Sequence, residues 1–219
     1  MLILLLRHAG PKFCATAILV VALASAVYAG GWAVVTVKDL PECVVSGQRV
    51  SLTFTVRQHG VHLLGGLSPK VRATAASGGE VTASAWATPV TGEYTAALTF
   101  PQKGTWTIAI ESGFLTNSVT LPPLAVIAPD EPSPQPLPEA LRGERLFIAK
   151  GCASCHLHEA IRSVRSFGVG PDLSRKHSPA DRLERFLADP GPGSEYGQMP
   201  NLGLAPREIA ELIAFINQQ

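Results

Sequence analysis

An alternation of apolar and polar positions runs through residues 32–126 and predicts short β-strands with one buried face. The alternation is clearest at 50–57 and recurs at 94–100 and 106–110, with glycine-containing turn signals between the runs. Short strands at regular intervals are typical of an antiparallel β-sandwich of the immunoglobulin-like type, which we expect over residues 31–128. The residues predicted to face its core are Val50, Leu52, Phe54, Val56, Tyr94, Ala96, Leu98, Phe100, Trp106, Ile108 and Ile110.

Helical periodicity replaces this alternation beyond residue 138 and predicts three helices. The first covers residues 139–150 and places Gly143 and Phe147 one turn apart on a common face. The second helix is predicted to begin with Ser178 as its N-cap and Pro179 at its first position, and to end at Pro190. The third helix is predicted to begin at Pro206. The apolar stripes of these two helices contain Leu183, Phe186, Leu187, Ile209, Leu212, Ile213 and Ile216. A helical domain of this size has a marginal core, so we expect another group to supply packing surface.

Residues 129–138 contain five prolines among polar and acidic neighbours. This composition cannot build a core and favours extended geometry, so the segment is predicted to be a semi-rigid linker. It separates the sandwich from an all-α domain over residues 139–219. The expected architecture is therefore multidomain.

Residues 1–30 have the features of an export signal. No charged residue occurs from Phe13 to Val37, and Arg7 and Lys12 come just before this apolar run. Two interpretations remain open. Cleavage after Ala29 would release a secreted protein. Retention of the segment as a membrane anchor, which we favour, would hold the chain at the extracytoplasmic (periplasmic) face of the plasma membrane.

Composition and charge exclude several classes of protein. The 219 residues are 46% hydrophobic and carry 18 basic against 17 acidic side chains, without a basic cluster. A disordered chain would be less hydrophobic, and a nucleic-acid-binding surface would be more basic, so neither is expected.

The sequence Cys152-Ala-Ser-Cys155-His156 has the C-x-x-C-H spacing of a c-type haem attachment site. Both thiols would form thioether bonds to one haem, and His156 would bind its iron. A zinc ribbon would need a second cysteine pair, whereas Cys14 and Cys43 are solitary. Thioredoxin-type chemistry would need a strand before the pair, where this sequence predicts a helix.

Met199 is the candidate for the second axial ligand of the iron. Apart from Met1 it is the only methionine, and it lies in a loop rich in glycine and proline rather than on an apolar helical stripe. A methionine that only fills a gap in the core is the alternative. His177 stays open as a competing ligand, whereas His158 lies too close to His156 in the chain to reach the opposite face of the ring.

The order of these motifs resembles the class I cytochrome c family over residues 139–219. The resemblance rests on the run from Gly143 to His156, on Gly170-Pro171-Asp172-Leu173, on Gln198-Met199-Pro200-Asn201-Leu202, and on a terminal helix. It implies an all-α cytochrome c fold, in which Gly143 and Phe147 pack against the helix that carries Phe215. It also implies that the Pro171 carbonyl accepts a hydrogen bond from His156 and orients its ring.

The sandwich region is similar, more loosely, to YtkA-like and FixH-like extracytoplasmic domains. The shared stretches are Arg57-Gln-His-Gly60, Gly92-Glu-Tyr94 and Gly104-Thr-Trp106. His59 and His62 would be the candidates if this domain bound copper. Solvent-exposed turn histidines are the favoured interpretation, and Cys43 is interpreted as a small buried residue.

An iron with both axial positions filled passes one electron and leaves no place for a small-molecule substrate. The expected function is that of an extracytoplasmic mono-haem electron carrier, not an enzyme, either tethered or a subunit of a respiratory or photosynthetic membrane complex. Its partners would be redox proteins and subunits of that complex. Two alternatives remain: a gas or peroxide sensor or enzyme in which Met199 is displaced, and a copper-delivery module built on the sandwich.

Overall fold

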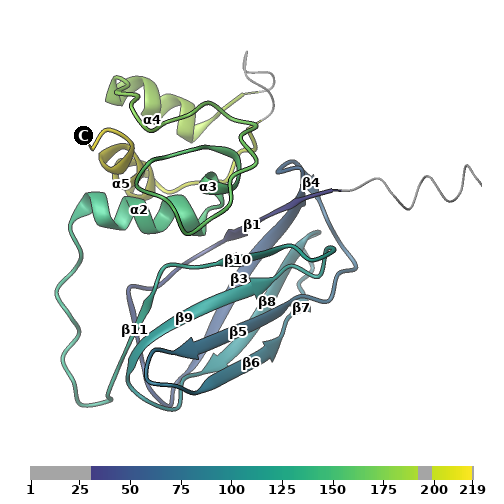
Figure 1. Ribbon diagram of the computed structural model, residues 1–219, viewed down its shortest axis with the longest axis vertical. Coiled ribbons are helices and arrows are strands. Elements are labelled where there is room, and N and C mark those ends of the chain that lie inside the picture. The colour runs from purple at the N-terminus through teal and green to yellow at the C-terminus, as the bar shows by residue number, and fades with distance from the viewer. Residues whose placement is uncertain (1–30, 192–198, 219) are drawn as a thin grey trace, which may run out of the picture. The chain divides into compact units, whose positions relative to one another are not determined.

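The computed structural model describes residues 31–191 and 199–218. The predicted export signal or anchor over residues 1–30 lies outside these ranges. Within the ranges, no helix combines the length and the apolar character needed to cross a membrane. Strands make up residues 33–127 together with their connecting loops, and helices follow from residue 139 onward (Figure 1).

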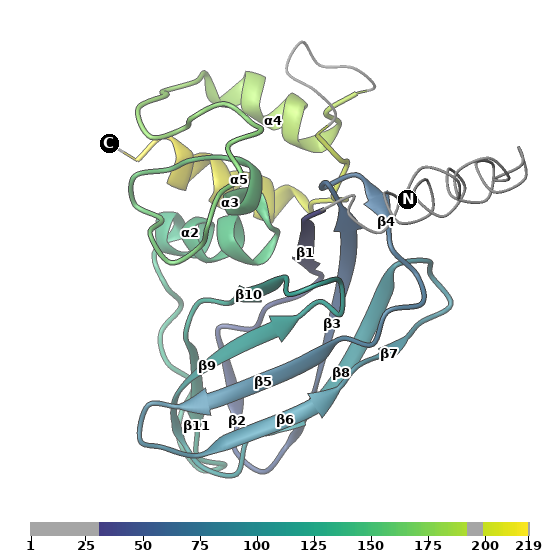
Figure 2. The same ribbon diagram turned by 45° about the vertical axis from the view of Figure 1, so that its right-hand side comes forward.

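The strands form the two sheets of a β-sandwich, which confirms the fold predicted from the alternation (Figure 2). The first sheet has the order β1 (Ala33–Val37), β3 (Arg49–Gln58), β8 (Glu93–Thr99) and β7 (Trp86–Ala87), with β4 (His62–Leu63) paired to β3. The second has the order β2 (Cys43–Val45), β11 (Leu124–Ile127), β9 (Gly104–Glu111), β5 (Lys70–Ala75) and β6 (Glu80–Ser84), with β10 (Ser118–Thr120) paired to β9.

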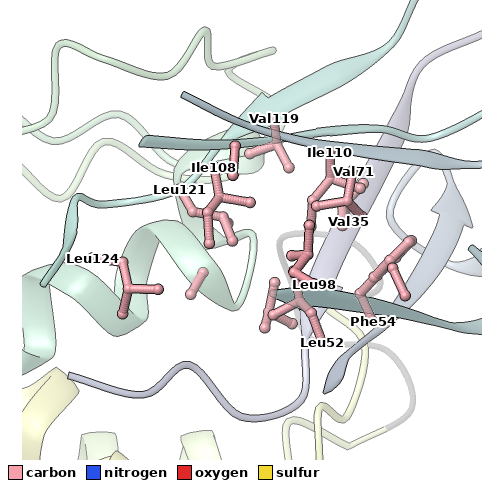
Figure 3. Packing of buried hydrophobic residues seen from close by; sticks show 14 of the residues in the cluster. Val35, Leu52, Phe54, Val71, Leu98, Ile108, Ile110, Val119, Leu121 and Leu124 are labelled. Carbon is pink, nitrogen blue, oxygen red and sulfur yellow. The ribbon is translucent and has the colours of Figure 1, made fainter. Parts of the chain in front are cut away.

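The core between the sheets is built from alternate residues of the long strands. In the antiparallel pair of β3 and β8, Leu52 lies opposite Ala96 and Phe54 lies opposite Tyr94. Figure 3 shows side chains of both sheets meeting in this core. All the residues predicted to face it are buried except Val50, which is partly buried and packs against the others. The strand register therefore follows the period-two pattern of the sequence.

One strand pair departs from the predicted antiparallel sandwich. β2 runs parallel to β11, with Cys43 opposite Ala125. β1 and β2 follow each other closely in the chain but belong to different sheets. Pro41 lies between them and has no N–H to continue the first ladder, so the chain crosses to the second sheet there. Cys43, predicted to be buried, is only partly buried because β2 is an edge strand.

β1 is an edge strand whose two faces are both covered. All five of its residues are buried. Ala33, Val35 and Val37 belong to the core of the sandwich. Val34 lies against Gly151, where an added Cβ atom would overlap the Val34 side chain. The sandwich therefore covers one face of β1, and the helical part of the chain covers the other.

The helical part contains α2 (Glu139–Ala149), α3 (Cys152–Cys155), α4 (Ala180–Ala188) and α5 (Pro206–Ile216). α2 and α5 cross at Gly143, where an added Cβ atom would overlap the carbonyl group of Glu211 and lie 2.7 Å from Cβ of Phe215. Beside this crossing, the rings of Phe147 and Phe215 have centroids 5.4 Å apart. This is the packing that the family resemblance implied for Gly143, Phe147 and the last helix.

The second predicted helix needs two corrections. Ser178 is not its N-cap. Pro179 occupies that position, because the backbone N–H and C=O of Ser178 are hydrogen-bonded instead to the side-chain amide of Asn217, at 3.0 and 2.9 Å. Phe186 does not belong to the buried stripe, since it is exposed whereas Leu187 is buried. α4 packs against α5, and this contact covers only a narrow face of the helix.

Candidate functional site

The short helix α3 holds the two cysteines of the C-x-x-C-H motif. Gly151 precedes it with a φ of +82°, a left-handed conformation that glycine adopts without strain. The His156 N–H donates to the carbonyl of Cys152 at 2.9 Å, which closes the turn. Cys152 and Cys155 therefore lie one helical turn apart, and His156 leaves the helix in an extended conformation. This backbone brings two thiols and one imidazole to the same region.

His156 is oriented by the backbone of the following loop. Its Nδ1 atom lies 3.0 Å from the carbonyl oxygen of Pro171, the hydrogen bond that the resemblance implied. A carbonyl can only accept, so Nδ1 carries the proton and Nε2 keeps a free lone pair. The loop is held in place because the Gly170 N–H donates to the carbonyl of Cys155 at 2.9 Å. The ring is thus prepared to bind a metal ion through Nε2.

Burial sets the protonation of the candidate ligands. It lowers the pKa of His156, against which the hydrogen bond to Pro171 acts in the opposite direction. Burial also raises the pKa of Cys152 to about 12, and it raises the pKa of Cys155. At neutral pH the site therefore contains a neutral imidazole and two protonated thiols.

Met199 packs against the same apolar cluster as Cys152. The cluster is centred on the buried residues Phe147, Leu212 and Phe215, and both Cys152 and Met199 are partly buried at its periphery. The segment after Met199 is fixed to the end of α4, because the Asn201 side chain donates to the carbonyl of Ala188 at 3.4 Å. His156, Cys152, Cys155 and Pro171 are brought together directly, and Met199 joins them through this shared cluster.

The other histidines have different surroundings. His158 is buried, with its ring centroid 4.3 Å from that of Phe215 and 5.7 Å from that of Phe147. It is a core residue. His59, His62 and His177 are all exposed. In the described part of the chain, no group of three or more His, Cys, Asp or Glu residues is arranged to hold a metal ion.

Sequence reasoning missed several residues around these ligands. An added Cβ atom at Gly170 would lie 2.6 Å from Nδ1 of His156, so only glycine leaves room for the ring. Gly60, from the sandwich, lies close to Sγ of Cys155, and Trp32 stacks on Phe167. Gly170 belongs to a motif that the sequence shows, but nothing in the local sequence links residues 32 and 60 to the cysteines.

The residues present fit a covalently bound haem. Two thiols one turn apart, a neutral imidazole with a free Nε2 and a thioether are the donors that a c-type haem requires. Partly buried apolar side chains pack against the same cluster as Cys152 and Met199 and offer the surface that a flat apolar ring needs. They are Leu146, Ile161, Val164, Leu173, Leu183, Leu202 and Ile213.

Comparison with known proteins places the helical part in a family. Residues 140–219 match the family described as cytochrome c, so the C-terminal part of the chain is a cytochrome c domain. Such a domain implies a covalent haem c and haem-based electron transfer, and cytochrome c domains usually work outside the cytoplasm. A search of the curated proteins found no significant match.

Three solved structures that resemble the chain each match less than half of it. The Lin-41 filamin domain matches with 10% identity and a TM-score of 0.36, covering 42% of this chain and 91% of its own. Domains 4 and 5 of the S-layer protein SbsC match with 22% identity and a TM-score of 0.31, covering 45% of this chain and 54% of their own. A CARDB domain from Pyrococcus furiosus, solved with di-metal ions, matches with 20% identity and a TM-score of 0.28, covering 45% and 94%. Likeness at this level carries no conclusion about this chain.

Proposed function

We propose that this protein is a single-electron carrier with one haem c bonded to Cys152 and Cys155, with His156 and Met199 as the axial ligands of its iron. The observation that carries the proposal is the hydrogen bond from His156 Nδ1 to Pro171, because it leaves Nε2 free beside two thiols on one helical turn. When bound, haem supplies an iron that gains and loses one electron.

The residues of this chain would tune that exchange. The Pro171 carbonyl fixes the ring of His156 and raises its basicity as a ligand. The apolar side chains around Met199 exclude water, which disfavours the extra charge of the oxidised state. With both axial positions filled, the site has no place for a substrate, so we expect no enzymatic activity from the chain alone.

We further propose that the protein works on the extracytoplasmic side of the plasma membrane with redox proteins as partners, as a tethered carrier or a subunit of a respiratory or photosynthetic membrane complex. The apolar run near the N-terminus supports the tether. The ten basic and ten acidic side chains of residues 139–219 support it as well, since a freely diffusing carrier guided by charge would be less balanced. Extraction in mild detergent should recover a larger assembly, whereas a soluble protein isolated alone would contradict this role.

The axial ligation is tested by Met199→Ala. Wild-type protein should show the weak long-wavelength methionine-to-iron band when oxidised, and carbon monoxide should not change its spectrum when reduced. Met199→Ala should lose the band and bind carbon monoxide readily. Leu204→Ala, which removes a buried apolar side chain from the same cluster, is the matched control and should keep the band and exclude carbon monoxide as wild type does.

Binding of carbon monoxide by the wild-type protein at neutral pH would contradict the carrier proposal. The position opposite His156 would then be open or labile, and the gas or peroxide sensor would become the better account. A wild-type protein that lacks the band and still does not bind carbon monoxide would instead exclude Met199 as the ligand and turn attention to His177, which is exposed.

Gly170→Ala tests whether Gly170 leaves the space that positions the His156 ring. Its Cβ atom would push against the imidazole, weaken iron ligation and destabilise the domain by about 1–2 kcal/mol. The matched control is Gly65→Ala, since a Cβ atom at Gly65 would meet only the Thr91 side chain, at the ordinary contact distance of 3.9 Å. Imidazole added to the oxidised protein competes with His156 for the iron, and an optical titration follows this displacement. Gly170→Ala should lose its own ligand at a lower imidazole concentration than wild type or the control. Equal behaviour of the two variants would show that Gly170 does not position the ring.

A further inference from the structure

A corner of the β-sandwich lies directly against the second cysteine of the haem motif. This corner, which we call the sandwich corner, consists of Trp32, His59 and Gly60. An added Cβ atom at Gly60 would lie 3.6 Å from Sγ of Cys155 and 3.7 Å from the Trp32 ring. Gly60 is buried and has a φ of +76°, a left-handed conformation that glycine adopts without strain in the β3–β4 turn.

Trp32 extends this contact to the loop that follows the motif. Its ring stacks on Phe167 with centroids 4.5 Å apart and an interplanar angle of 19°. Phe167 is fixed to α3 because its N–H donates to the carbonyl of Ser154 at 2.8 Å. The His59 ring packs against the Trp32 ring at an angle of 53°, with centroids 5.7 Å apart. The aromatic contact therefore joins the sandwich corner to the helix that carries both cysteines.

Polar contacts elsewhere also join the sandwich to the helical part. Lys150, at the end of α2, donates from Nζ to the carbonyl of Lys38 at 2.6 Å. Arg145 donates to the carbonyl of Pro123 at 2.5 Å. With the packing of Val34 on Gly151, these contacts connect β1 and its neighbours to α2 and α3. The approach of Gly60 to Cys155 is thus one part of an extended junction within the chain.

We propose that the sandwich corner is part of the haem site, a role that rests on the proposed function. The sulfur of Cys155, which would bond to haem, lies beside the β3–β4 turn at Gly60, so the part of a haem bonded there would lie near the sandwich corner. Trp32 and Gly60 are positioning residues that exclude water from this part of the haem and close it to redox partners. Exclusion of water disfavours the oxidised state, so the sandwich corner raises the reduction potential.

The proximity is tested by NMR on the full haem-loaded protein labelled with nitrogen-15. The three tryptophans give three indole N–H signals, assigned with Trp32→Phe and Trp86→Phe. The unpaired electron of oxidised iron shifts nearby nuclei, and the shift falls with the cube of distance. Between the reduced and oxidised states, the Trp32 signal should move several-fold more than those of Trp86, which is exposed on β7, and Trp106, which is buried in the sandwich.

The effect on the iron is tested by reduction potentials. Trp32→Ala should lower the potential by admitting water, and Trp32→Phe should restore it because a ring again stacks on Phe167. Trp86→Ala removes an exposed tryptophan of the same domain and should leave the potential unchanged. A role of Trp32 in folding alone would lower stability without moving the potential of the folded protein.

The outcomes separate this inference from the proposed function. Suppose that haem is bonded to the chain but the Trp32 signal moves no more than that of Trp86. This result would overturn the role of the sandwich corner and leave the electron-carrier proposal intact. A potential unchanged in Trp32→Ala would do the same. Protein from a haem-attaching host that carries no covalent haem by mass spectrometry would overturn both.

Discussion

Replacing Gly143 with alanine should destabilise the helical domain by about 3 kcal/mol. Helix propensity alone predicts the opposite sign, because alanine in a helix interior is more favourable than glycine by about 1 kcal/mol. The crossing of α2 and α5 reverses this preference. The new Cβ atom would overlap the carbonyl of Glu211 and press on Phe215, and both obstacles belong to the body of α5 rather than to a flexible side chain. The helices would have to separate, which loosens the packing of Phe147 on Phe215.

Urea unfolding followed by circular dichroism at the helical wavelengths measures this effect. The control is Ala210→Leu, which enlarges an exposed side chain of α5 and should change the unfolding free energy by less than about 0.5 kcal/mol. A Gly143→Ala protein as stable as wild type would show that the two helices do not cross this closely in solution.

Lys150→Met should destabilise the protein by about 3 kcal/mol. The Lys150 side chain is only 7% exposed, and its Nζ lies 2.7 Å from Oε1 of Glu208 and 2.6 Å from the carbonyl of Lys38. Methionine keeps the volume but leaves both acceptors without their cation. Glu208 also accepts the N–H of Ala205 at 3.0 Å, so the disturbance reaches the first turn of α5.

The pair formed by Lys103 and Glu131 is the matched control. It is also a lysine paired with a glutamate, at 3.4 Å, but the two side chains are 65% and 43% exposed. Solvent screens such a pair, so Lys103→Met should cost less than about 1 kcal/mol. Unfolding free energies of the two variants at several salt concentrations make the comparison. Equal losses would mean that burial does not strengthen the contacts of Lys150.

The sandwich could be predicted because its strands obey a local rule. Every second residue of β3, β8 and β9 is apolar, and a strand with one buried face needs no further information to be recognised. β1 is the exception. Its sequence, AVVTV, does not alternate, because its second face is covered by residues more than 100 positions later, among them Gly151. Consecutive apolar residues on both faces, with Thr36 as the one polar residue, are the sequence signal of this two-sided burial.

Other details depend on tertiary contacts that no local pattern encodes. Serine is a residue type that favours the N-cap position, but the backbone N–H and C=O of Ser178 are hydrogen-bonded to the side-chain amide of Asn217, just after α5. The parallel pairing of β2 with β11 likewise depends on two segments from opposite ends of the domain. Propensity describes each residue by itself, so it cannot predict the hydrogen bonds of Ser178 or the pairing of β2 with β11.

The residues of the candidate site also fall into two groups: those that the sequence reveals and those that only the folded chain reveals. The thiols and His156 are recognisable from five consecutive residues, because thioether chemistry fixes their spacing. Pro171 needed the family resemblance, and its carbonyl is now seen within hydrogen-bonding distance of His156. Ligation of the iron by Met199 stays a prediction. The approach of Gly60 to Cys155 needed the folded chain, since it joins two domains.

The parallel pair of β2 and β11 has a consequence for the order in which the protein assembles. Strands from the two ends of the domain must meet to close the second sheet, and such distant pairings form slowly because a long loop is ordered first. Arg145 of α2 donates to the carbonyls of Pro41 and Pro123, which lead into these two strands. Its binding place exists only once the strands have met, so this contact between the helical part and the sandwich can form only after the second sheet has closed.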